Sequence, residues 1–587
     1  MSSKKTPKAG KGDFKKLIPF IGQYKKATVL TPLFMVGEVA MEVTIPYTMA
    51  KIIDVGIAGG DLGYVAKVGL LMICMAIFSL CCGALSGRFA AVAGAGFAKN
   101  IRNRMFSKIQ DFSFANVDHF STASLITRLT ADVTSTQNAF VNIIRGMVRA
   151  PLMFVCAIFM SVRISPRLSL IFLFALPVIT VGVVFLMTRT MPLFKKMLEM
   201  YDGMNASVQE NLIGIRVVKA FVREDHESEK FREAAKNVQM AQKKAEKLMI
   251  LSMPVMNFII YSCMIAVSWF GGQQIIGGTM LTGQFFSFLS YLSQILSSFM
   301  MISMSFIGLV MARASVRRIV EVLDEIPDID DSTADFDLQV KDGSIRFEGV
   351  SFSYDKRSDN LHLEKADLSI AAGETVGIIG GTGSSKTTLV QLIPRLYDPL
   401  EGSVQVGGHD VKEYTIQNLR DSVAMVLQKN VLFSGTIRDN LRWGNPDATD
   451  EEIEEACRAA AAHDFITSFP DGYDTDLGQG GVNVSGGQKQ RLCIARALLK
   501  KPKIIILDDS TSAVDTATDA SIRKALREKL ADTTTIIIAQ RITSVQDADR
   551  IIVMDGGEIN AIGTHEELLQ NNPIYREVYQ SQQKGVA

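Results

Sequence analysis

The chain has 587 residues, of which 48% are hydrophobic, and its mean hydropathy is +0.19. It is too long for a single domain and more apolar than an ordinary soluble protein, so part of it is expected to lie in lipid. The 62 basic and 61 acidic residues nearly cancel, which argues against a nucleic-acid-binding protein whose affinity comes from overall positive charge.

Residues 1–25 form a lysine-rich polar tail, which begins MSSKKTPKAGKGDFKK, and a short elbow helix is expected at its end. The tail lacks the apolar core and the cleavage site of a signal peptide. We therefore expect it to remain on the protein and to face the cytoplasm, following the positive-inside rule.

Long apolar segments are confined to the first 312 residues, and a helix needs roughly 20 such residues to cross a membrane. The expected spans are 26–50, 68–87, 139–162, 168–188 and two within 248–312, a stretch without Asp, Glu, Lys or Arg. Six membrane helices are therefore predicted within 26–312. With an even number of spans, both termini lie on the same side of the membrane.

The first span contains Glu38 and Glu42, which are four residues apart and so lie on one helix face. Carboxylates at membrane depth are costly unless they face water or a partner. They could attract cationic amphiphiles within a transport cavity, or they could pair with Arg145 or Arg149 of the third span. The sequence leaves both alternatives open.

Two charged stretches, 89–137 and 195–247, are too polar for lipid but consist largely of helix-favouring residues. We expect the membrane helices to continue through them into the cytoplasm. Residues 313–340 are expected to link the membrane domain to a second domain at 341–587. From Ser344 this second domain shows strands and helices in an α/β order.

In this second domain an apolar strand runs into the glycine-rich turn GGTGSSKTT and then into a helix, the pattern of a phosphate-binding loop. Lys386 would reach the outer phosphates of a nucleotide, and the Thr387 hydroxyl would ligate Mg²⁺. Ser385 stands where glycine usually precedes the lysine, and its side chain can strain the loop. The predicted nucleotide-binding residues of the loop are Gly380, Gly381, Thr382, Gly383, Ser384, Ser385, Lys386, Thr387 and Thr388.

A distant apolar run, 504–507, ends at two adjacent carboxylates, Asp508 and Asp509. Asp508 is predicted to be the second residue that holds Mg²⁺. The position of Asp509 raises a further question: whether it acts as a catalytic base, or occupies the position of one while being too short to act.

With these two motifs, VSGGQKQR at 484–491 makes the chain resemble half of an ATP-binding cassette exporter over essentially its whole length. The resemblance implies a membrane all-α domain of six transmembrane helices fused to a cytoplasmic α/β P-loop nucleotide-binding domain, the type IV exporter architecture. It implies ATP and Mg²⁺ as cofactors, adenine stacking on Tyr354, and Gln428 as a sensor of Mg²⁺ and the attacking water. Short coupling helices are expected near 116–129 and 211–224.

In this family two cassettes close head to tail, so each ATP lies between the phosphate loop of one chain and the signature sequence of the other. The resemblance therefore assigns the signature residues to the ATP of the partner chain: Ser485, Gly486, Gly487 and Gln488. It also assigns a D-loop to Ser512, Ala513, Val514 and Asp515.

Two residues depart from the family pattern at the chain's own ATP site. Asp509 stands where the catalytic Glu is usual and is shorter by about 1.5 Å. Misplacing a catalytic group by about 1 Å can lower a rate on the order of a hundredfold. Gln540 stands where the switch His is usual, and an amide cannot carry a proton at neutral pH.

These departures lead to the hypothesis that the chain is the degenerate-site half of a heterodimeric exporter. Its partner would be a second half-transporter with an intact catalytic Glu and switch His. The expected cargo is an amphiphilic small molecule of multidrug or lipid-like type, with no nucleic-acid partner. The expected location is the membrane of a bacterial cell, crossed several times, with both termini cytoplasmic. The alternatives are a slow homodimeric exporter or lipid flippase, and a gated channel or regulator.

Overall fold

The computed structural model describes residues 13–355, 357–509, 515–529 and 532–584. The chain forms two compact units. Residues 1–108 and 123–324 make up one, here called the helical unit, and residues 109–122 and 325–587 make up the other, here called the α/β unit.

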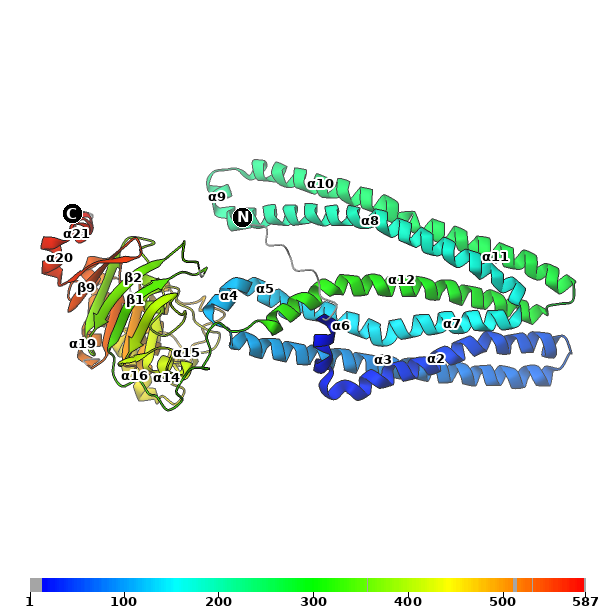
Figure 1. Ribbon diagram of the computed structural model, residues 1–587, viewed down its shortest axis with the longest axis horizontal. Coiled ribbons are helices and arrows are strands. Elements are labelled where there is room, and N and C mark those ends of the chain that lie inside the picture. Colours follow the sequence, from blue (N-terminus) through cyan, green and yellow to red (C-terminus); the bar gives the residue numbers. More distant parts are fainter. Residues whose placement is uncertain (1–12, 356, 510–514, 530–531, 585–587) are drawn as a thin grey trace. The chain divides into compact units, whose positions relative to one another are not determined.

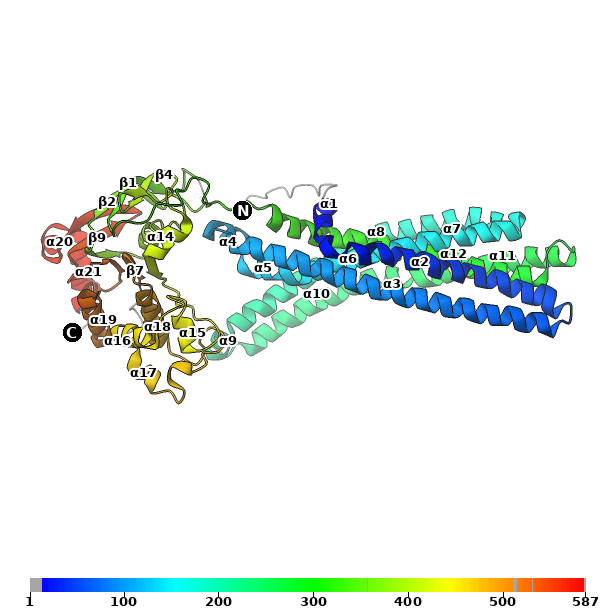
Figure 2. The ribbon, with the colours of Figure 1, turned by 90° about the horizontal axis from the view of Figure 1, so that it is seen from below.

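The helical unit consists of long helices that run side by side (Figure 1, Figure 2). Its α-helices are α1 (Asp13–Leu17), α2 (Lys25–Lys51), α3 (Leu62–Gln110), α5 (Thr122–Thr127), α6 (Val133–Val141), α7 (Met147–Ile164), α8 (Pro166–Ile213), α9 (Ile215–Ala220), α10 (Glu224–Ile250), α11 (Ser252–Ile276) and α12 (Thr282–Asp324). Short 3-10 and π-helical turns join several of them: η1 (Ile18–Tyr24), η2 (Ile52–Ile57), η3 (Arg128–Asp132) and η4 (Asn142–Gly146).

Five helical segments among the described residues are long and apolar enough to cross a membrane: Asp13–Ile57, Leu62–Gln110, Thr122–Ile164, Asn257–Ile276 and Thr282–Asp324. The remaining expected span lies in α8, whose apolar part is found as the shorter segment Pro166–Gly182. The structure thus places a helix at each of the six expected spans. The turn between α7 and α8 follows from Ser165, which caps α8, and from Pro166, which lacks an N–H to donate.

The core of the helical unit forms where α12 packs against α2 and α7. Buried apolar side chains from α2, α7 and α12 meet there, among them Met35, Met153 and Phe288. The Tyr291 hydroxyl of α12 donates a hydrogen bond to the Val43 carbonyl of α2, 2.6 Å away. This bond satisfies the polar end of a side chain that is otherwise completely buried.

Both charged stretches continue membrane helices, as the sequence predicted. Helix α3 runs past its apolar part to Gln110, and α8 runs to Ile213. Helix α10 then returns beside α8, so the two form a long antiparallel pair (Figure 1, Figure 2). Helix α12 continues past Ala312 to Asp324, into the segment expected to be a linker.

The α/β unit contains two sheets and the short helix α4 (Phe114–Phe120). Its strands are β1 (Ile345–Phe352), β2 (Leu363–Ile370), β3 (Thr375–Gly380), β4 (Glu401–Val406), β5 (His409–Asp410), β6 (Val423–Val426), β7 (Ile504–Asp508), β8 (Thr534–Ile538), β9 (Arg550–Asp555) and β10 (Glu558–Gly563). Its other α-helices are α13 (Lys386–Gln391), α14 (Ile416–Ser422), α15 (Ile437–Leu441), α16 (Asp450–Ala459), α17 (His463–Thr467), α18 (Gly486–Leu499), α19 (Thr516–Lys529), α20 (His565–Asn571) and α21 (Pro573–Lys584).

The larger sheet has the strand order β10-β9-β3-β8-β7-β6, and all its strands are parallel except β10. Because parallel strands end at the same edge, the chain leaves β3, β7 and β8 on one side of the sheet. These three strands end at Gly380, Asp508 and Ile538. The phosphate loop, the acidic pair and Gln540 are thereby brought to one edge, although they are far apart in sequence.

Candidate functional site

The phosphate-binding loop follows β3 directly and leads into α13. A Cβ atom at Gly380 would lie 2.3 Å from the Met554 carbonyl oxygen, so only glycine fits there. The Lys386 ammonium donates to the carbonyl oxygens of Gly380 and Gly381, at 2.9 and 2.8 Å. Burial lowers the pKa of Lys386, and the nearby carboxylates of Asp508 and Asp509 oppose this shift. A glycine-rich loop that leads into a helix with a lysine beside it is suited to a phosphate.

Ser385 stands where the usual loop has glycine, and its backbone conformation is strained. Its φ is +67°, the left-handed region that favours glycine. For a residue with a Cβ this conformation costs on the order of 1–2 kcal/mol. The serine side chain makes no capping hydrogen bond to the start of α13 in return. The loop therefore adopts the conformation of a glycine loop with some strain.

Thr387 and Asp508 form the predicted magnesium pair. The Thr387 hydroxyl lies 2.9 Å from one Asp508 carboxylate oxygen and 3.1 Å from the other. Asp508 is almost fully buried, and burial raises its carboxyl pKa. The described parts of the chain contain no group of three or more His, Cys, Asp or Glu side chains that could hold a metal ion. One hydroxyl and one carboxylate suit Mg²⁺, which binds few protein groups and completes its shell with water and substrate phosphates.

Asp509 is held by two amide side chains. The Gln540 Nε2 atom donates to its Oδ2 atom at 2.9 Å, and Gln428 makes a further hydrogen bond to it. Burial raises the pKa of Asp509, while the bonds from Gln428 and Gln540 oppose this shift. Its backbone φ of +48° is also left-handed. Gln540 is itself fixed by Gln582, whose amide donates to the Gln540 carbonyl at 2.7 Å.

This arrangement determines what the site can do with a water molecule. A general base must reach the water and take its proton. Here the short Asp509 side chain already accepts hydrogen bonds from two amides, and an amide neither gains nor loses a charge at neutral pH. Part of the hydrogen-bonding capacity of the Asp509 carboxylate is thereby taken up by side-chain amides.

Tyr354 presents an aromatic ring beside the phosphate loop. Its hydroxyl lies 2.9 Å from the Thr388 hydroxyl, and 41% of the residue is exposed. The rings of Phe352 and Tyr397 meet it edge to face, at centroid distances of 4.8 and 5.2 Å. Burial raises the pKa of the Tyr354 phenol, which therefore stays neutral. A fixed, partly exposed ring at this place can stack with a base.

The signature residues lie at the start of α18 and do not share a hydrogen bond with the phosphate loop. The Ser485 backbone N–H donates to the Gln488 side chain at 2.8 Å, and the Gln488 N–H donates back to the Ser485 hydroxyl. This capping box leaves the start of a 14-residue helix exposed at Ser485 and Gly486. Three of the expected D-loop residues, Ser512 to Val514, lie outside the described residues. Asp515 caps the start of α19 by accepting from the Thr518 backbone at 3.0 Å.

Glu38 and Glu42 share one arginine, Arg149. Its guanidinium lies 2.7 Å from Glu38 Oε1 and 2.8 Å from Glu42 Oε1. Of the two sequence alternatives, the structure therefore shows the ion pair, and it involves Arg149 rather than Arg145. The second Glu38 oxygen, Oε2, is buried without a hydrogen-bond partner and packs against Gly83 of α3.

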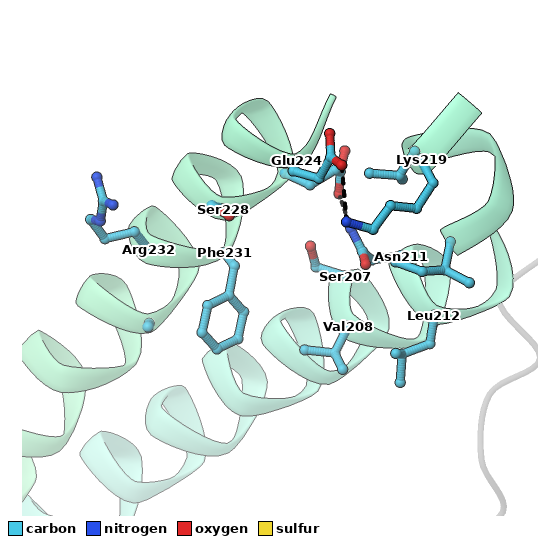
Figure 3. Close-up of a pocket in the computed structure, with 13 residues that line it drawn as sticks. Ser207, Val208, Asn211, Leu212, Lys219, Glu224, Ser228, Phe231 and Arg232 are labelled. Carbon is cyan, nitrogen blue, oxygen red and sulfur yellow. Dashed lines mark hydrogen bonds and ion pairs between the residues drawn. The ribbon is translucent and has the colours of Figure 1, made fainter. Parts of the chain in front are cut away.

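The tip of the α8–α10 pair contains α9 and a cavity of about 590 Å³ (Figure 3). The Lys219 ammonium lies 2.9 Å from the Glu224 carboxylate. Figure 3 shows this pair at one side of the cavity, with the apolar side chains of Val208 and Phe231 below it. Phe221 and Val222, which follow α9, are 74% and 81% exposed. The tip lies within the expected coupling segment 211–224 and presents an apolar surface.

Two contacts of the site were not anticipated from the sequence. Gln582 fixes the Gln540 backbone, and Tyr397 connects Tyr354 to Asp118 of α4, as described below. Neither residue belongs to a motif that sequence reasoning singled out. Each contact joins residues that are far apart in the sequence, so it can be seen only in the folded structure.

Two family models and several known proteins are similar to this chain. Residues 29–299 match the family model of the ABC transporter transmembrane region, and residues 363–512 match the model called ABC transporter. The uncharacterized ABC transporter ATP-binding protein YfiB of Bacillus subtilis is 37% identical over 568 residues, which are 97% of this chain and 98% of that protein. An ATP-dependent lipid A-core flippase of Syntrophus aciditrophicus is 33% identical, with 84% of this chain and 81% of the relative covered.

A solved structure also matches over nearly the whole chain. It is the structure of a bacterial Atm1-family ABC exporter with ATP bound, which has a TM-score of 0.80 and 25% sequence identity. The match covers 95% of this chain and 98% of the other. Both units of the chain thus have counterparts in one exporter fold.

Proposed function

The chain belongs to the ABC transporter family, and from that premise we propose that it is the degenerate-site half of a heterodimeric exporter. It would bind ATP and Mg²⁺ at its own phosphate loop but rarely hydrolyse the nucleotide there. Its partner would be a second half-transporter with an intact catalytic Glu and switch His. The observation that carries this proposal is the Asp509 carboxylate, which accepts a 2.9 Å hydrogen bond from Gln540 where a free base and a proton carrier are required.

In this proposal the chain contributes to two unequal ATP sites. At its own site, Lys386 and the start of α13 hold the phosphates, while Thr387 and Asp508 hold Mg²⁺ with Gln428 nearby. Bound Mg²⁺ neutralises charge on the phosphates. At the partner's site, the exposed start of α18 offers the Ser485 hydroxyl and helix N–H groups to a γ-phosphate. Hydrolysis at the second site uses the partner's base.

Nucleotide energy would reach the membrane through the tips of the long helices. The cytoplasmic tip at α9 offers exposed apolar side chains that a cassette groove can cover. Closure of two cassettes on ATP would then shift the membrane helices between two states that differ in affinity for nucleotide. The cargo would leave by alternating access.

We propose an amphiphilic cargo of multidrug or lipid-like type. The lipid A-core flippases among the relatives favour a lipid-like molecule. The pairing of Glu38 and Glu42 with Arg149 argues against two free carboxylates that select cations. The proposed location is a bacterial cell membrane with both termini cytoplasmic.

The test is ATP turnover by the purified full-length chain in lipid nanodiscs, measured alone and together with its partner half-transporter. The proposal expects the chain alone to bind ATP and to hydrolyse it very slowly, and the pair to hydrolyse it rapidly. Lys386→Ala in the chain alone provides the background of an empty site. Rapid turnover by the chain alone, well above that background, would instead identify a homodimeric exporter.

A further inference from the structure

Helix α4 is built into the α/β unit. The segment 109–122 groups with residues 325–587 and is inserted between α3 and α5 of the helical unit. Asn116 of α4 donates to the Glu325 carboxylate at 2.9 Å and accepts from the Asp328 backbone at 3.2 Å. Ser113 and Asn116 also form a capping box at the start of α4. Helix α4 is therefore attached to the segment that follows α12 by hydrogen bonds that do not involve the nucleotide site.

A second attachment of α4 runs through Tyr397. The Tyr397 hydroxyl donates a 2.8 Å hydrogen bond to the Asp118 carboxylate. The Phe114 ring meets the Tyr397 ring edge to face, at 6.0 Å and 85°. Burial and the adjacent Asp118 both raise the pKa of the Tyr397 phenol above its usual range, so it remains a neutral donor. A hydrogen bond to a carboxylate is stronger and more directional than one between neutral groups.

The same Tyr397 ring contacts the ring of Tyr354 edge to face, at 5.2 Å and 88°. Tyr354 in turn bonds to Thr388 of α13, next to the magnesium-binding Thr387. A cavity of about 250 Å³ borders both tyrosines together with Ser113 and Ala115 of the α4 segment. A continuous chain of contacts therefore runs from the phosphate-loop helix through two tyrosines to α4, all within one compact unit.

We propose that Tyr397 is a positioning residue that transmits nucleotide occupancy at Tyr354 to α4 through its hydrogen bond to Asp118. The proposal rests on the proposed ATP site, in which adenine stacks on Tyr354. A stacked base fixes the Tyr354 ring, and this ring forms one wall of the packing around Tyr397. The Tyr397 hydroxyl then holds Asp118 in a defined place, so α4 responds to the bound nucleotide.

The test uses Tyr397→Phe, which keeps the ring and removes the hydroxyl, in the full-length transporter with its partner in nanodiscs. Two quantities are measured: the affinity for the nonhydrolysable analogue AMP-PNP, and the AMP-PNP-induced distance change between spin labels on the membrane helices of the two halves. Affinity is expected to stay within about twofold of the unsubstituted protein. The ratio of shifted to unshifted transporters at saturating AMP-PNP is expected to fall about tenfold.

A matched control is Tyr414→Phe. The Tyr414 hydroxyl also donates a buried 2.8 Å hydrogen bond, but to the Val406 carbonyl within the sheet of the same unit. This control is expected to lower thermal stability and to leave the distance change intact. Asp118→Ala removes the acceptor from an exposed position, so it retains the fold, and it is expected to reproduce the effect of Tyr397→Phe.

The double variant Tyr397→Phe with Asp118→Ala distinguishes a shared bond from two separate effects. If the bond transmits the signal, the double variant responds no worse than either single variant. A normal distance change in Tyr397→Phe, or effects of the two single variants that add, would overturn the proposal. Tyr354→Ala tests the underlying ATP site separately. Unchanged AMP-PNP affinity in that variant would contradict adenine stacking, whereas the distance change in Tyr397→Phe tests the Tyr397–Asp118 hydrogen bond.

Discussion

Asp509 and Gln540 are two separate departures from the family pattern that meet in one hydrogen bond. In the proposed function each alone would weaken a step of hydrolysis, since one shortens the base and the other replaces a proton carrier with an amide. They also form a hydrogen bond with each other, in which the Gln540 amide donates to the Asp509 carboxylate in place of a water molecule. Ser385 adds backbone strain to the same site through its left-handed conformation.

Repair of this site is expected to require both residues. Asp509→Glu alone should raise ATP turnover by the isolated chain only a few-fold, because Gln540 still bonds the carboxylate. Asp509→Glu combined with Gln540→His should raise it on the order of a hundredfold, because the base then has its usual reach and a proton carrier beside it. Phosphate release measures both variants, and adding Lys386→Ala to the double variant should abolish the gain. Full activity from Asp509→Glu alone would show that Gln540 does not impair the site.

At the level of elements, Arg149 joins α7 to α2 through two carboxylates inside the membrane region. Glu38 is almost fully buried, and the Arg149 guanidinium lies 2.7 Å from its Oε1 atom. The long sequence separation between α2 and α7 explains why the sequence left the alternatives open. Both Arg145 and Arg149 lie on the same segment, and their directions depend on the π-helical turn η4 that precedes α7.

Removing Arg149 is expected to be strongly destabilising. Arg149→Leu leaves two carboxylates without their cation and should cost about 3–5 kcal/mol, seen as a lower thermal unfolding temperature in nanodiscs. Lys219→Ala breaks the exposed Lys219–Glu224 pair at the α9 tip and should lower the unfolding temperature far less, because solvent screens an exposed ion pair. The alternative is that Glu38 and Glu42 attract cationic compounds in a transport cavity. It would be supported if the double variant Glu38→Gln, Glu42→Gln kept its stability and lost transport of positively charged compounds only.

For the whole transporter, the proposal predicts two unequal ATP sites. This chain contributes its phosphate loop to one site and its signature residues to the other. The signature residues of this chain lie at an exposed helix start and, in the proposal, would serve the partner's nucleotide. Its phosphate loop and Asp509 would serve its own nucleotide. Substitutions in the signature residues and at Asp509 should therefore change ATP turnover by different amounts.

In the reconstituted pair, Gly487→Asp is expected to lower ATP turnover at least about tenfold, because it places a negative charge where a γ-phosphate must bind. Asp509→Asn is expected to leave turnover nearly unchanged, because its site contributes little hydrolysis. Both variants are compared at saturating Mg-ATP with the same partner. An equal loss in the two variants would show equivalent sites.

Much of the fold followed from local patterns. Apolar segments of sufficient length marked the membrane helices, because a chain in lipid must satisfy its own backbone hydrogen bonds. The phosphate loop could be recognised because its chemistry lies in consecutive residues, 380–388. The structure also brings the Thr387 hydroxyl to Asp508, since Thr387 follows one strand and Asp508 ends another strand of one parallel sheet, and both reach its same edge.

The sequence by itself determined which chemical groups are present: the phosphate-binding loop, the shortened carboxylate and the missing switch histidine are covalent facts. Only the tertiary structure decided which of them meet. It brought Gln540 onto Asp509, chose Arg149 as the partner of Glu38 and Glu42, and placed Tyr397 between Tyr354 and α4. Such contacts depend on strand order and helix packing across hundreds of residues, and no local pattern encodes them.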